Sequence, residues 1–217
     1  MRNKKLLLFI GILFALLVVL FFTVKYLNQQ DKPKPVKKKE TIKGIQISTD
    51  FNTNSFSGKN DTKLLKNLGL CDSTINWSED LDKPSCTPNF FRVFPLKKGL
   101  DIAQGCMVLM KAGVNHFPVR RFVIYEKEGA QMIQANGFIG YPIEFRPQDQ
   151  NYDDVVIRFF ERYEGQKYFY NCLFTWKQNR YQYVRCEQIN DANIKPEKQE
   201  QVSAEILKFL NDKQLVF

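Results

Sequence analysis

The sequence predicts an α+β domain, built on an antiparallel sheet and preceded by a membrane anchor. Three features indicate this: an uncharged run near the N-terminus, seven short segments rich in Val, Ile, Phe and Tyr, and an amphipathic stretch near the C-terminus. Aromatic residues make up 14% of the 217 residues, which excludes a globally disordered chain. We therefore expect a signal anchor at 1–27, a linker at 28–43 and a soluble domain at 44–217.

The anchor is predicted from residues 6–24, which carry no charge. As a helix this run spans about 28 Å, close to the thickness of a bilayer core. It is longer than the apolar part of a cleavable signal, and it ends in Phe-Phe-Thr-Val, which suits cleavage poorly. We expect an uncleaved transmembrane helix. A cleaved signal peptide and a buried core helix remain open as alternatives.

The linker, 28–43, contains Pro33 and Pro35 and should be extended. Its lysine run, 37–39, could contact anionic lipid, or it could belong to a solvated spacer. Basic residues flank the apolar run on both sides, so the positive-inside rule does not decide the orientation. We favour a single-pass inner-membrane protein with its C-terminal domain in the periplasm. A cytoplasm-facing adaptor is the alternative.

The positive charge lies mostly outside the domain. The net charge is +9, and residues 1–43 carry +8 of it. A domain that binds nucleic acid needs a basic face of its own. The composition of 44–217 therefore excludes nucleic acid as the expected partner.

The seven candidate strands are joined by short connections, which favour one antiparallel meander sheet of about six or seven strands. A short helix over 62–69 should be capped by Asp61 and end at Gly69. Pro196 suits the first turn of a C-terminal helix, whose apolar stripe should pack on the sheet. The strands are expected at 90–97, 105–111, 119–127, 130–138, 154–163, 166–176 and 181–189, and the stripe consists of Val202, Ile206, Phe209 and Leu210.

Four of the five cysteines form two candidate disulfides. A three-residue loop over 178–180 would set Cys172 directly opposite Cys186 on paired strands. Cys71 and Cys86 bracket an irregular segment that would gain from a crosslink. The alternative is that all five cysteines are reduced in a cytosolic domain.

One motif gives a weak metal candidate. Asp149, Asn151 and Asp153 stand at alternate positions, as in the start of a calcium loop. The positions that should hold Gly and Glu are Asp154 and Phe160. A polar turn whose aspartates bond the local backbone is the favoured interpretation.

No catalytic residue, cofactor-binding residue or cofactor is expected. The sequence contains no nucleophile motif and no phosphate-binding glycine loop. Cys106 lies in an apolar strand, which favours an inert buried thiol, and the sole histidine, His116, lies in a turn. The rival hypothesis is a protein that binds or hydrolyses envelope glycans, with acidic residues of 154–163 in its site.

Aromatic residues cluster on the last strands and suggest a possible contact surface. The alternative is that the C-terminal helix covers one face and the remaining rings are amphipathic surface tyrosines. The candidate contact residues are Tyr168, Tyr170, Trp176, Tyr181 and Tyr183.

The stretches FFRVFPL, FPVRRFVIYEKEG, YDDVVIRF, YFYNCLFTWKQNRYQYVRCEQI and the final LVF resemble uncharacterised membrane-anchored envelope proteins of Bacteroidetes-type bacteria. The resemblance implies a single-pass or exported protein and brings no known activity. We therefore expect a non-enzymatic interaction or structural module of the envelope, with the membrane and an envelope protein as partners. The oligomeric state is not predicted.

Overall fold

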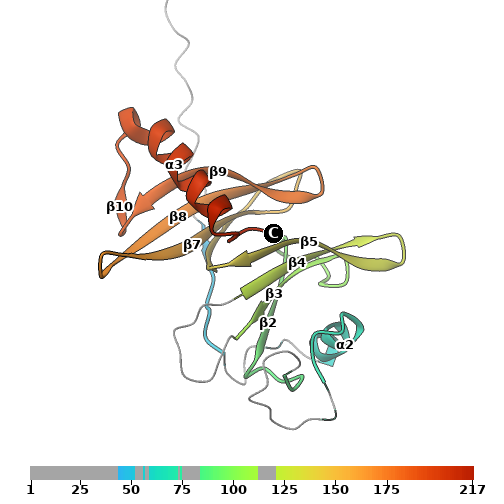
Figure 1. Cartoon of the computed structure of the whole chain (residues 1–217). Coiled ribbons are helices and arrows are strands. Elements are labelled where there is room, and N and C mark those ends of the chain that lie inside the picture. The colour runs from blue at the N-terminus through green and yellow to red at the C-terminus, as the bar shows by residue number, and fades with distance from the viewer. Residues whose placement is uncertain (1–43, 52–55, 57–58, 73, 75–83, 112–120) are drawn as a thin grey trace, which may run out of the picture. The chain divides into compact units, whose positions relative to one another are not determined.

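The computed structural model (Figure 1) describes residues 44–51, 56, 59–72, 74, 84–111 and 121–217. The chain separates into two compact units, Met1–Thr41 and Ile42–Phe217, and every described residue belongs to the second. No helix within these residues is long and apolar enough to cross a bilayer. The expected anchor, the linker and His116 lie outside the described residues.

Two antiparallel sheets form the described part of the chain (Figure 1). The six-stranded sheet runs, in spatial order, β1 (Ile45–Gln46), β6 (Tyr141–Arg146), β7 (Asp154–Tyr163), β8 (Gln166–Lys177), β9 (Arg180–Ile189) and β10 (Ala192–Asn193). The four-stranded sheet runs β2 (Phe91–Pro95), β3 (Gly105–Met110), β4 (Arg121–Glu128) and β5 (Gln131–Ile139). The antiparallel strands and the α+β class are confirmed, whereas the expectation of one sheet is wrong.

The second sheet is covered on both sides at its strand β3, which is apolar on both faces. Five consecutive residues of β3, 105–109, are buried, so neither face of this strand meets water. One face packs on the helix α2 (Lys59–Asn67), which supplies Leu64 and Leu65 to a separate small core. The other face packs on the six-stranded sheet. The four-stranded sheet is therefore a middle layer.

Helix α2 differs from its expected form at its first residue. It begins at Lys59, so Asp61 lies in the first turn, where its side chain is buried, and does not precede the helix. Its end agrees with expectation, because Gly69 has a φ of 65° and the amide of Leu70 bonds back to the carbonyl of Leu65.

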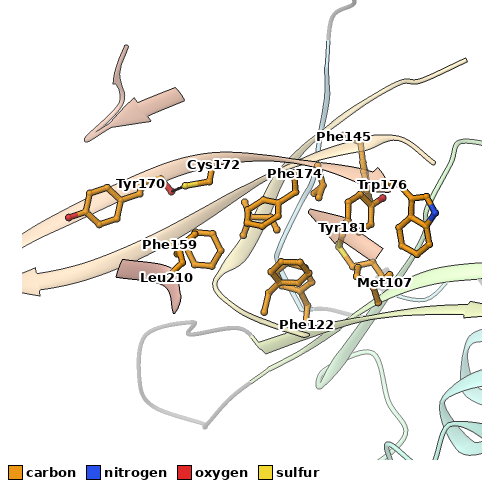
Figure 2. Close-up of a cluster of buried hydrophobic side chains, with 14 of the residues drawn as sticks. Met107, Phe122, Phe145, Phe159, Tyr170, Cys172, Phe174, Trp176, Tyr181 and Leu210 are labelled. Carbon is orange, nitrogen blue, oxygen red and sulfur yellow. Dashed lines mark hydrogen bonds between the residues drawn. The ribbon is translucent and has the colours of Figure 1, made fainter. Parts of the chain in front are cut away.

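The main core lies on the inner face of the six-stranded sheet (Figure 2). Phe122 and Phe138 of the four-stranded sheet stack with ring centroids 4.8 Å apart, and Phe174 of β8 meets Phe138 edge-on at 5.3 Å. The C-terminal helix α3 (Gln199–Asp212) follows a short 3-10 turn, η2 (Pro196–Lys198). It buries Ile206 and Leu210 in this core, which confirms the expected apolar stripe.

The last residues of the chain continue the four-stranded sheet. Val216 pairs with Phe138 of β5, and the amide and carbonyl of Phe217 both bond Gly137. The Phe217 ring occupies the space that a Cβ on Gly137 would need. The edge of β5 is thereby covered, and glycine is required where the ring lies.

Candidate interaction surface

The β8–β9 hairpin sets the geometry of the candidate surface. Gln178 and Asn179 form a two-residue loop in which both have positive φ, 53° and 59°, as a type I′ turn requires. The expectation of a three-residue loop is therefore wrong. This loop alone would place Cys172 opposite Arg185, but Val184 is an extra residue in β9 and restores the pairing of Cys172 with Cys186.

The predicted cysteine pairs have different outcomes. Cys71 and Cys86 form a disulfide with a Cα–Cα distance of 5.0 Å, as expected. Cys172 and Cys186 do lie opposite one another, but both are free, buried thiols. Cys106 is also free and buried, and burial, reinforced by Asp61, raises the pKa of its thiol to about 12.

The aromatic residues proposed as a contact surface belong to the core instead. Tyr181 is 1% exposed, and Tyr170 and Trp176 are also buried. Tyr168 and Tyr183 are half-buried and pack against the same core. Alternation along β8 places its candidate rings on the inner face, and the two-residue loop pairs Tyr181 with Trp176, so Tyr181 and Tyr183 share that face.

Their hydroxyl groups are bonded within the protein. Tyr181 donates to the carbonyl of Asp153 at 2.8 Å, and Tyr183 donates to the carbonyl of Ser203 at 2.9 Å. Burial is the main reason why the pKa of both phenols is raised. These groups therefore stay protonated near neutral pH and serve the fold.

The opposite side of the six-stranded sheet, called here the outer face, carries an ion-pair network. Arg146 of β6 donates to both carboxylate oxygens of Glu187 of β9, at 2.9 and 2.7 Å. It also donates to Glu144 at 3.2 Å, while Arg185 donates to Glu187 at 2.6 Å. Since β7 and β8 lie between β6 and β9, the Arg146–Glu187 pair crosses two strands.

A second polar row lies beside this network. Arg158 of β7 donates to Asn171 of β8 at 2.7 Å and forms an ion pair with Asp191. Asn171 donates to Gln188 at 2.6 Å, and Gln188 donates to Asn193 at 2.9 Å. Side chains from four neighbouring strands and the turn before β10 are thus fixed in position.

Apolar groups are interspersed with these polar ones on the outer face. Val156 and Leu173, in the row between Glu144 and Arg185, are buried. Phe160 is 37% exposed and Val184 is 41% exposed. The outer face therefore combines fixed charges and amides with accessible apolar groups, a composition suited to recognition.

The charges around Glu187 on the outer face do not favour a role as a general acid. Burial raises the pKa of Glu187, but the hydrogen bonds and charges of Arg146 and Arg185 outweigh it, so the net pKa is lowered. The same bonds raise the pKa of Arg146 despite its burial. General acids at neutral pH need a raised carboxyl pKa, and Glu187 has the opposite shift.

The acidic residues named for a hydrolase lie in separate settings. Asp154 is 9% exposed and accepts a bond from Gln148 at 2.7 Å. Glu161 accepts the hydroxyl of Tyr170 at 2.9 Å on the inner side of the sheet. Because Asp154 and Glu161 lie seven positions apart along β7, they fall on opposite faces of the sheet.

The calcium-loop motif forms a polar turn. Asp153 is buried, and one of its carboxylate oxygens accepts the backbone amide of Gln148 at 3.2 Å. Asp149 and Asn151 are exposed, and the backbone carbonyl of Asp149 accepts a bond from Lys97. The described residues hold no group of three or more His, Cys, Asp or Glu side chains arranged for a metal ion.

Hollows on the surface of the described part include one of about 570 Å³ between α2 and the β4–β5 hairpin and one of about 340 Å³ on α2. Another, of about 510 Å³, is at the tip of the β8–β9 hairpin and is lined by Asn151, Trp176, Lys177, Gln178, Asn179 and Gln182. None of the three is lined by a carboxylate, a cysteine or a histidine.

Comparisons of the chain with protein-family models, with curated proteins and with solved structures find no match.

Sequence reasoning missed the outer face, although a signal was present. In β8, Tyr170, Cys172 and Phe174 alternate with Asn171, Leu173 and Thr175, so the polar Asn171 and Thr175 had to face away from the rings. The ion-pair partner of Arg146 could not be predicted from local alternation, because Glu187 is 41 residues away in sequence.

Proposed function

We propose that the protein is a single-pass protein of the bacterial inner membrane whose C-terminal domain lies in the periplasm and acts as a non-enzymatic interaction module. Its contact surface is the outer face of the six-stranded sheet. One observation carries this proposal: the Arg146–Glu187 network fixes polar side chains across several strands, beside the accessible Phe160 and Val184. Both described α-helices pack elsewhere, α2 on the four-stranded sheet and α3 in the main core.

The periplasmic location has separate support. Structural disulfides persist in oxidising compartments, and Cys71–Cys86 is such a bond. Protease treatment of intact spheroplasts tests the location, because an outward domain is digested while the inner membrane stays closed. Full protection, with digestion only after lysis, would favour the cytoplasm-facing adaptor.

The contact surface is tested by photo-crosslinking in the native cells. A photoreactive amino acid replaces Phe160 or Val184, and, as a control, Leu207 of α3, which is 38% exposed. The proposal expects a discrete crosslinked protein at Phe160 and Val184 and none at Leu207. Equal products at all three positions, or none at Phe160 and Val184, would contradict it.

Glycan binding is the second candidate, and the hollow at the β8–β9 tip favours it. The amide side chains that line this hollow are suited to the hydroxyl groups of a sugar. Co-sedimentation of the full-length protein with purified cell-wall glycan tests this. Gln182→Ala should reduce pelleting if the hollow binds sugar, whereas Gln201→Ala on α3 should not.

A further inference from the structure

Cys172 and Cys186 lie directly opposite one another on paired strands, and both are free thiols in the structure. Residues directly opposite on antiparallel strands have Cα atoms about 4.5 to 5.5 Å apart. A disulfide needs a Cα separation of about 4.4 to 6.8 Å. Closure of the pair therefore requires rotation of side chains and no movement of β8 or β9.

The two thiols contact backbone carbonyls of their own strands. The Cys186 thiol donates to the carbonyl of Gln188 at 3.4 Å, and the Cys172 thiol donates to the carbonyl of Tyr170 at 3.9 Å. Since the thiolate is the nucleophile in disulfide exchange, the cysteine that loses its proton first attacks the oxidant, and the other cysteine follows.

Helix α3 is fastened at the same cysteine. The amide of Cys186 donates to the hydroxyl of Ser203 at 3.2 Å, and Gln199 donates to the Cys186 carbonyl. Gln199 also donates to the Ser203 hydroxyl at 2.9 Å. These three contacts are called here the α3 latch. With the latch closed both sulfurs are fully buried, so an external oxidant has no access.

We propose that Cys172 and Cys186 are an oxidisable dithiol, which a disulfide-bearing oxidant closes to a second disulfide when the α3 latch is open. One of the two cysteines loses its proton, attacks one sulfur of the oxidant as the thiolate, forms a mixed disulfide and releases one thiolate. The other cysteine then loses its proton and attacks the sulfur of the first, which releases the second thiolate. The protein loses two electrons and two protons, and the oxidant is reduced to two thiols. The proposal is independent of the proposed contact surface.

Peptide mapping of the purified full-length protein in detergent tests the bond. The reduced protein is incubated with oxidised glutathione, quenched in acid, denatured, alkylated and digested with trypsin. The expected product is a disulfide-linked pair of peptides, 168–177 and 186–198. Separate alkylation of both cysteines after Cys71–Cys86 has re-formed would overturn the proposal.

Variants test the two-step exchange and the latch. Cys172→Ser and Cys186→Ser should each retain a glutathione adduct on the remaining cysteine, whereas the wild type should lose the adduct as its disulfide closes; no adduct in either variant would overturn the exchange. The double variant Gln199→Ala, Ser203→Ala should close the disulfide about tenfold faster, because the lost hydrogen bonds raise the open population. The matched control is Glu200→Ala, on the exposed side of α3. Equal rates of disulfide closure in the latch variant and the control would show that α3 does not control access to the cysteines. If a variant fails to fold, the peptide map of the wild-type protein still decides whether the disulfide forms.

Discussion

The bidentate Arg146–Glu187 pair should couple strands β6 and β9 by about 2 kcal/mol. Exposed ion pairs contribute up to about 1 kcal/mol, and breaking a fully buried one costs about 3–5 kcal/mol. The side chains of Arg146 and Glu187 are 29% and 18% exposed, which places the pair between these limits. A double-mutant cycle with Arg146→Met and Glu187→Gln isolates this coupling, because Met keeps the apolar stem and Gln keeps the shape.

Urea unfolding of the full-length protein in non-ionic detergent measures the cycle. The fluorescence of buried Trp176 reports the transition. In a separate thermal unfolding experiment, a free-energy change of about 2 kcal/mol would shift the Tm of a domain of this size by about 4–8 °C. The control cycle uses Gln201 and Glu205, an exposed hydrogen-bonded pair on α3, which should couple by less than about 0.5 kcal/mol.

Acidification provides the decisive comparison. The pKa of Glu187 is lower in the folded protein than its usual value near 4.3. Its stabilising contribution is therefore complete above the unfolded pKa and is lost as the pH falls through the lower folded pKa. The Arg146–Glu187 coupling should be present at pH 7 and should weaken progressively as the pH falls below about 4.3. A coupling below about 0.5 kcal/mol at pH 7, or one unchanged by acid, would refute the reasoning.

Three further substitutions test other contacts by the same unfolding assay. Cys71→Ser opens a disulfide with a sequence separation of 15 and should lower the unfolding free energy by about 3 kcal/mol under oxidising conditions, with no effect after reduction. Gly137→Ala should cost about 1–3 kcal/mol because its Cβ meets the Phe217 ring, and it should cost little in a Phe217→Ala background. Tyr181→Phe should cost about 1–3 kcal/mol, because it leaves the buried Asp153 carbonyl without its hydroxyl donor; a neutral result would show that another group satisfies that carbonyl.

Seven of the strands and both α-helices were predictable because their signals are local. Alternation of apolar and polar residues and the turn residues between them define β7, β8 and β9 within a residue or two. The two-sheet architecture had a weaker signal in β3, where GCMVLM is apolar at consecutive positions and so indicates a strand covered on both faces. The strand β6 was missed because Pro142 interrupts it and Gly140 precedes it, and both residues are typical of loops.

The candidate site was less predictable because it depends on distant pairings. The aromatic residues of β8 and β9 were interpreted as a possible surface because they are numerous, but alternation places Tyr168, Tyr170 and Trp176 on one face. The number of aromatic residues does not indicate which face of β8 and β9 packs on the four-stranded sheet. The charges that form the outer face come from strands far apart in sequence, and local patterns do not show which of them meet.

The two irregularities of β9 explain how one short segment serves both faces of the sheet. Val184 and Glu187 are extra residues relative to β8, one on each side of Cys186. The first returns Cys186 to its place opposite Cys172, and the second brings Glu187 to Arg146 while Gln188 stays opposite Asn171. A regular strand would place fewer side chains on the outer face over the same length. The dithiol on the inner face and the ion-pair network on the outer face therefore depend on the same local departure from regular pairing.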